Sequence, residues 1–149
     1  MTAETTPTLE KFGYPTTCIH DYTHWAVLLR PQQVTLASLV LVEKSTATSY
    51  GEISDAAMAE QKQAVADIEQ NLTALFAPEK FNYLMLMMVD PNVHFHVIPR
   101  YSAEKTFAGV PFTDTGWPKL PDMAHDHGLS DDAFMTLLHH LRHHWHVGE

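Results

Sequence analysis

The chain has 149 residues, 45% of them hydrophobic, which is the size of one domain with a core that needs no disulfide or metal for support. Its 18 acidic and 9 basic residues give a formal charge of −9, which argues against nucleic acid as the main partner. Cys18 is the single cysteine, so no intrachain disulfide forms, and a cytoplasmic location is expected. We expect no signal peptide and no membrane partner, because the first residues lack a basic and apolar leader and no apolar run is long enough to span a bilayer.

The N-terminal part of the chain is polar and then turns apolar. Residues 1–15 predict an irregular arm, and residues 16–149 predict one domain that ends in a loop and helix extension. The first apolar runs predict a short edge strand at 16–20, a buried strand at 24–30 and another strand at 37–44. The last two strands are close and similar in length, which favours an antiparallel hairpin.

Residues 54–76 predict a long helix. Ser54 is a good N-cap, and Asp55 lies in the first turn, where the helix dipole favours a negative charge. Apolar residues recur at steps of three and four, which is typical of a helix with one buried face. They are Met58, Val65, Ile68, Leu72, Leu75 and Phe76.

The second half of the chain predicts two strands, a long loop and a final helix. The strands are expected at residues 81–89 and 93–100, separated by a "DPN" turn. A loop rich in proline and glycine follows Arg100, and a helix is expected over residues 131–146 after the N-cap Ser130. This element order predicts an α+β domain, with a mostly antiparallel sheet of about five strands and the long and C-terminal helices packed on it.

The strand at residues 93–100 carries an unusual polar pattern. Side chains alternate across a strand, so Asn92, His94 and His96 share one face while the apolar residues between them point to the other. One interpretation is a set of histidines that are satisfied by hydrogen bonds inside the fold. The other is chemical, because a neutral imidazole can attack phosphorus and a second imidazole can hold a phosphate oxygen.

Residues 92–100, "NVHFHVIPR", resemble the signature strand of the histidine triad (HIT) superfamily, in which three histidines alternate with apolar residues. The order of elements over residues 16–101 is similar as well. The resemblance implies a HIT-like fold, a homodimer, and hydrolysis or transfer of nucleotidyl groups from dinucleoside polyphosphates or nucleoside phosphoramidates. It also implies a reaction that passes through a covalent nucleotidyl-histidine intermediate and that requires no cofactor and no bound metal.

The same resemblance implies roles for individual residues. His94 takes the place of the nucleophile, His96 that of the phosphate contact, and Asn92 that of the first histidine, which supports the site by hydrogen bonding. Arg30 stands where a ribose-binding Asp or Asn is common, and Ser38 where many relatives have histidine, so both are expected to contact substrate. Since asparagine takes no proton at neutral pH, the alternative is a nucleotide-binding protein of this fold with weak or lost catalysis.

Two further segments carry candidate residues. Trp117 and Lys119, in the long loop, supply an aromatic surface and a cation for a base or phosphate, although Trp117 alternatively only pins the loop to the domain. Five histidines lie in residues 139–146, and their four-residue spacing is able to chelate a metal. We expect a solvated helix face there and no metal site.

Overall fold

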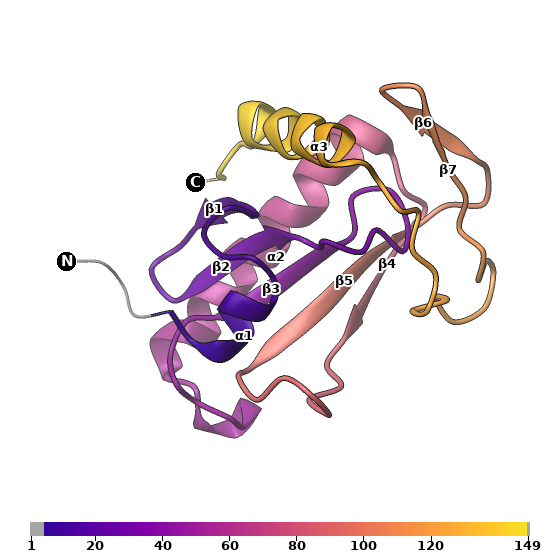
Figure 1. The fold of residues 1–149 in the computed structure, drawn as a ribbon. Helices are drawn as coiled ribbons and strands as arrows, with labels where there is room; N and C mark the ends of the chain where they lie inside the picture. The colour runs from indigo at the N-terminus through magenta and orange to yellow at the C-terminus, as the bar shows by residue number, and fades with distance from the viewer. Residues whose placement is uncertain (1–4, 149) are drawn as a thin grey trace.

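The computed structural model describes residues 5–148 and contains a five-stranded antiparallel sheet with the spatial order β1-β2-β3-β5-β4 (Figure 1). The strands of this sheet are β1 Cys18–Asp21, β2 Trp25–Leu29, β3 Leu39–Glu43, β4 Lys80–Leu84 and β5 His94–Arg100. The remaining elements are α1 Pro7–Lys11, the 3-10 turn η1 Tyr50–Glu52, α2 Asp55–Phe76, the hairpin β6 Lys105–Phe107 and β7 Val110–Phe112, and α3 Asp131–His144. The predicted α+β class and the antiparallel sheet are confirmed.

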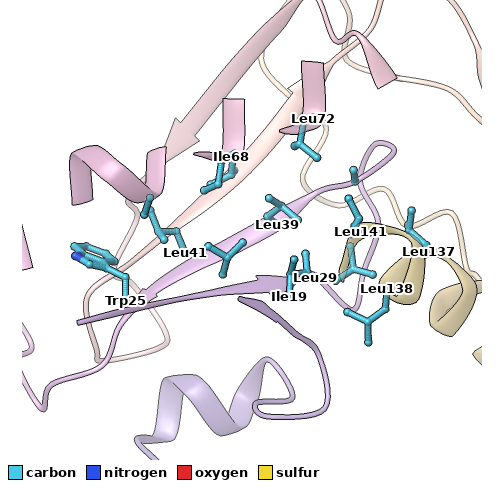
Figure 2. Close-up of a cluster of buried hydrophobic side chains, with 14 of the residues drawn as sticks. Ile19, Trp25, Leu29, Leu39, Leu41, Ile68, Leu72, Leu137, Leu138 and Leu141 are labelled. Atoms are coloured by element: carbon cyan, nitrogen blue, oxygen red, sulfur yellow. The ribbon is translucent and has the colours of Figure 1, made fainter. Parts of the chain in front are cut away.

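The main core lies between one face of the sheet and the helices α2 and α3, as predicted. Figure 2 shows its centre, where Ile68 and Leu72 of α2 and three leucines of α3 face the strands. Trp25 is fully buried, and its indole nitrogen donates to the backbone oxygen of Ala57 at 2.7 Å. The other labelled core residues are Ile19, Leu29, Leu39, Leu41, Leu137, Leu138 and Leu141.

Helix α2 begins after the predicted N-cap, because the Ser54 side chain accepts from the amide of Ala57. Its buried face differs from the predicted stripe: Met58 is 43% exposed, while Asp67 and Asn71 are buried. The polar pair is buried because it binds the C-terminal segment. Asp67 accepts from the amide of Gly148, and Asn71 exchanges hydrogen bonds with the backbone of His146.

The segment predicted as an irregular arm contains helix α1, on the sheet face opposite α2 and α3. The Thr6 side chain caps it, and Pro7 occupies its first turn, where the missing amide costs nothing. Leu9 and Phe12 pack against alternate residues of the central strands, namely Ala26, Leu28, Val40 and Val42. This five-residue helix forms because it covers an apolar sheet face, which its own polar sequence does not reveal. Residues 1–4 of the predicted arm lie outside the described residues.

The prediction of a strand over residues 81–89 is correct only at its start. Strand β4 ends at Leu84, opposite His96, and the following residues form a loop in which Leu86, Met88 and Val89 are at least half exposed. Their apolar character therefore does not report core burial.

The long loop after Arg100 also holds an unpredicted hairpin, β6 and β7. Ala108 and Gly109 both adopt positive φ angles in its two-residue turn. An Ala-Gly pair is a weak signal for such a turn compared with Asn-Gly.

Candidate functional site

The two histidines of β5 lie on the sheet face that α1 covers. His94 is opposite Val42 and His96 is opposite Val40, so all four side chains share this face. Both histidines line a pocket of about 240 Å³. The pocket is bounded by Lys11 and Phe12 of α1, by Arg30 and Gln32 after β2, and by residues 86–90 of the β4–β5 loop.

The imidazole of His94 has a defined proton position. Its Nδ1 lies 2.7 Å from the backbone oxygen of Asn92, and a carbonyl oxygen only accepts hydrogen bonds. Nδ1 therefore carries the proton in the neutral ring, and the lone pair is at Nε2. This is the tautomer that a histidine nucleophile acting through Nε2 requires.

His96 has the opposite tautomer because its neighbour only donates. The Nε of Arg30 lies 3.4 Å from Nδ1 of His96, so Nδ1 accepts and the proton is on Nε2. Burial, followed by the charge of Arg30 and the neighbouring His94, lowers the pKa of His96 to about 4. At neutral pH, His96 is therefore an uncharged hydrogen-bond donor.

Both Nε2 atoms are free to meet a ligand. Among residues 5–148, Trp145 Nε1 is the one buried side-chain nitrogen or oxygen atom without a hydrogen-bond partner. The Nε2 atoms of His94 and His96 also form no hydrogen bond within the protein. Because they are not among the buried atoms without a partner, both atoms are accessible to solvent in the pocket. The two rings lie 5.2 Å apart, and the Phe12 ring lies 5.8 Å from each of them. The lone pair of His94 Nε2 and the N–H donor of His96 Nε2 therefore lie close together beside the Phe12 ring.

The Asn92 side chain points away from this pair. Its Oδ1 accepts from the backbone amide of Thr8 at 3.2 Å, and the backbone amide of Asn92 donates to the Thr8 hydroxyl at 2.9 Å. These two bonds fasten α1 to the start of β5. Asn92 therefore touches His94 through its backbone oxygen, while its side chain holds the helix that carries Phe12.

Two cations and one carboxylate border the pocket. Burial lowers the pKa of Arg30, against the opposing effect of Asp126, and its Nη1 donates to the backbone oxygen of Gln32 at 2.8 Å. Lys11 and Asp90 approach to 3.6 Å at the rim. The charges of Lys11 and Asp90 balance each other, which leaves the positive charge of Arg30 beside the two histidines. The pocket therefore suits an anion.

The structure brings Arg30, His94 and His96 together, but not the other expected substrate contacts. Ser38 is fully buried, and its hydroxyl bonds within the 33–38 turn to the backbone of Thr35. Trp117 and Lys119 line a different pocket, of about 420 Å³.

Sequence reasoning missed Lys11, Phe12 and the 86–90 loop. Their pattern gave no signal, because nothing local in "EKFGYP" indicates a helix next to residues more than eighty positions away. The apolar run "LMMV" does mark the loop, but an apolar run of this kind equally predicts a strand.

Other parts of the molecule offer less chemistry. A hollow of about 530 Å³ lies where β2 begins and β3 ends, and it is larger than the histidine pocket. Its carboxylate, Glu43, is occupied by the hydroxyl and amide of Ser45. We assign the site to the smaller pocket because free imidazole nitrogens lie there.

Neither a metal cluster nor a membrane helix is present within residues 5–148. No group of three or more His, Cys, Asp or Glu side chains is placed to hold a metal ion, and no helix is long and apolar enough to cross a bilayer. In α3, the rings of His140 and His144 lie 4.4 Å apart as a pair.

No family model and no curated protein matches the sequence, but solved structures do match the fold. A histidine triad protein from Bradyrhizobium japonicum is 15% identical with a TM-score of 0.68, over 98% of this chain and 100% of its own. One from Sinorhizobium meliloti is 18% identical with a TM-score of 0.66, over 96% and 97%. A hypothetical histidine triad nucleotide-binding protein from Sulfolobus tokodaii is 15% identical with a TM-score of 0.64, over 85% and 81%. These likenesses establish that the chain has the histidine triad (HIT) fold.

Proposed function

We propose that this protein is a nucleotide hydrolase or nucleotidyl transferase with His94 as nucleophile. The observation that carries the proposal is the hydrogen bond between His94 Nδ1 and the Asn92 carbonyl, which leaves the Nε2 lone pair at the pocket. The similar Sulfolobus tokodaii structure is that of a hypothetical nucleotide-binding protein, which agrees with a nucleotide substrate.

The proposed reaction has two steps. His94 Nε2 forms a bond to the α-phosphorus of a dinucleoside polyphosphate, a nucleoside phosphoramidate or a related conjugate, and the bond to the leaving group breaks with its electron pair. The imidazole becomes positively charged, and the Asn92 carbonyl stabilises that charge through Nδ1–H. Water or another hydroxyl acceptor then attacks phosphorus and gives its proton to solvent, and the bond to Nε2 breaks with its electron pair returning to the imidazole.

His96 and Arg30 stabilise the phosphoryl oxygens in this scheme. The Nε2–H of His96 donates to one non-bridging oxygen, and the guanidinium of Arg30 supplies positive charge close by. Since His96 is neutral, it orients the oxygens without repelling Arg30. No step needs a cofactor.

The test is to incubate the protein with adenosine 5′-phosphoramidate and to examine it by intact-protein mass spectrometry after rapid acid-free quenching. We expect a nucleotidyl adduct on His94 and turnover that falls to the background rate in His94→Ala, with an unchanged circular dichroism spectrum. Normal turnover by His94→Ala would falsify the assignment of the nucleophile.

A second candidate is a nucleotide-binding protein of the same fold with little catalysis. The observation that favours it is that the first signature position supplies no titratable group, since Asn92 has an amide side chain, and that its Oδ1 is bonded to the backbone amide of Thr8. Calorimetry with adenosine monophosphate separates the candidates. Tight binding without turnover of any nucleotide conjugate supports binding alone.

We also propose a homodimer. The support is the resemblance of the signature strand to the HIT superfamily and the position of β4 at the edge of the sheet. Strand β4 is outermost and pairs with β5 on one side. Light scattering coupled to size-exclusion chromatography measures the mass, and a mass of one chain at all concentrations contradicts this part.

A further inference from the structure

A second pocket is lined by basic residues although the chain is acidic overall. It measures about 420 Å³ and is formed by Lys80, Asn82, Arg100, Trp117, Pro118, Lys119 and Leu120. Three of the nine basic residues of the chain line it, and none of its lining residues is acidic. On a protein with a formal charge of −9, this concentration of positive charge makes the pocket a place for an anion.

This second pocket lies along the same sheet face as the histidine pair. Lys80 is opposite Arg100 and Leu84 is opposite His96, and directly opposed residues share a face. Arg100 follows His96 by four residues, so its side chain leaves the same face about 13 Å further along β5. The two pockets are therefore distinct but lie in line.

A buried ion pair holds the wall of the second pocket in place. Arg100 donates to both carboxylate oxygens of Asp114, at 2.7 and 3.1 Å, and neither side chain is more than 4% exposed. The remaining Arg100 nitrogen, Nη1, donates to Asn82 Oδ1 at 2.6 Å. Because the oxygen of the Asn82 amide is occupied in this way, its NH₂ group is the part left for a ligand.

The loop that carries Trp117 and Lys119 is fixed to that wall. The amide of Trp117 donates to the backbone oxygen of Asp114, and the amide of Lys119 donates to the backbone oxygen of Gly116 at 2.8 Å. A Cβ atom at Gly116 would lie 2.3 Å from the backbone oxygen of Leu120, so this close turn admits only glycine. Trp117 is half-buried and held beside the cations.

The free positive charges of the second pocket are Lys80 and Lys119. The charge of Arg100 is balanced by Asp114, whereas neither lysine forms an ion pair with another residue in the described part of the chain. Two unbalanced ammonium groups, an amide donor and an aromatic face are the components that recognise a phosphate attached to an aromatic ring.

We propose that the second pocket binds an aromatic anion of the nucleoside phosphate class. The ring lies against Trp117, and the phosphate lies between Lys80, Lys119 and the Asn82 amide. This ligand has two possible sources. It is the distal part of the substrate, in which case the inference rests on the function proposed above, or it is a separate nucleotide, in which case the inference is independent of that function.

The binding test uses ADP and isothermal titration calorimetry in the His96→Ala background, where the first site has lost its donor to the phosphoryl oxygen. Trp117→Ala or Lys119→Ala is expected to weaken ADP binding about tenfold. Lys62→Ala is the matched control, because Lys62 is an exposed lysine of α2, on the other side of the sheet. Equal ADP affinity in Lys119→Ala, Trp117→Ala and Lys62→Ala overturns the proposal, and so does an absence of ADP binding in this background.

The kinetic test distinguishes the two sources of the ligand. If the pocket holds the distal part of the substrate, Lys119→Ala raises KM for diadenosine tetraphosphate and leaves KM for adenosine phosphoramidate unchanged. If it holds a separate nucleotide, both KM values are unchanged while ADP binding still depends on Lys119. A wild-type protein that turns over neither compound refutes the proposed function, and the calorimetric result then decides the second site independently.

Discussion

Asn92 contacts the site through its backbone and the covering helix through its side chain. Its carbonyl oxygen fixes the proton of His94, the side-chain Oδ1 accepts from the Thr8 amide, and the backbone amide of Asn92 donates to the Thr8 hydroxyl. The two tasks are independent, because any residue at this position supplies the carbonyl. An amide is suited to the second task, since it accepts from a backbone N–H without bearing charge.

Replacing Asn92 tests the second task. In Asn92→Ala, the buried amide of Thr8 loses its acceptor, and we expect the free energy of unfolding to fall by about 1–3 kcal/mol in urea titrations. Asn92→Asp keeps the acceptor oxygen and is the matched control, with a smaller loss. Equal stability of wild type and Asn92→Ala contradicts the interpretation.

The variant Asn92→His introduces the three-histidine pattern that this strand resembles. We expect no gain in turnover, because the added imidazole must displace the contact with Thr8. A tenfold rise in kcat/KM, about 1.4 kcal/mol of transition-state stabilisation, would show instead that the first histidine is missing from the chemistry.

His96 makes stability depend on pH. Its pKa is about 4 when folded, below the ordinary value of 6.5, so the unfolded chain binds more protons between these values. This contribution is therefore present above pH 6.5 and is lost as the pH falls towards 4. His96→Gln should lose less stability than wild type over this interval in thermal melts. His139→Gln, at an exposed position of α3, should behave as wild type.

At the scale of elements, the sheet has one face for stability and one face for the site. Helices α2 and α3 cover the first, whereas α1 and the β4–β5 loop surround the histidines on the second. A short helix therefore combines two functions: Leu9 and Phe12 bury apolar surface, and Phe12 and Lys11 border the pocket.

A pair of core substitutions separates these faces. Leu9 in α1 and Leu72 in α2 are both buried, so each change to alanine should cost about 2–5 kcal/mol of stability. Leu9→Ala should also lower kcat/KM several-fold well below its melting temperature, because Phe12 and Lys11 lose their support. Leu72→Ala should not. Equal effects on kcat/KM would show that α1 has no special relation to the site.

At the scale of the whole molecule, the long segment between β5 and α3 is attached by hydrogen bonds at both of its ends, and the buried ones converge on Asp114. Besides Arg100, the backbone amides of Tyr101 and Gly116 donate to the Asp114 carboxylate. His127 joins the far end of the segment to the turn after β2, because its Nδ1 bonds to the backbone oxygen of Gln33, and its Nε2 accepts from the amide of Thr113 within the segment. The segment therefore behaves as part of the domain.

Removing the Asp114 carboxylate should detach this segment. Asp114→Ala leaves the Arg100 charge buried without its partner, with an expected cost of about 3–5 kcal/mol. Limited proteolysis should then cut within residues 113–128 faster than in wild type. Asp122→Ala, at an exposed position bonded to Thr115, should change neither measurement.

The sequence predicted those features that depend on neighbours along the chain. The spacing of apolar residues predicted the helices α2 and α3, and the N-caps Ser54 and Ser130 predicted where they begin. The alternation of side chains along a strand placed His94 and His96 on one face. Where apolar residues do not lie in a strand, the prediction was wrong: residues 86–89 border a pocket instead of extending β4.

The sequence by itself thus determined the α+β class, the antiparallel sheet and the face of β5 that carries the two histidines, because local periodicity is visible in the order of residues. Only the tertiary structure decided how that face is used. Thr8 meets Asn92 across 84 positions and Arg30 meets His96 across 66, and these contacts set the orientation of α1 and the tautomer of His96. Contacts so distant along the chain leave no periodic trace in it, since they depend on how the strands and loops pack in space.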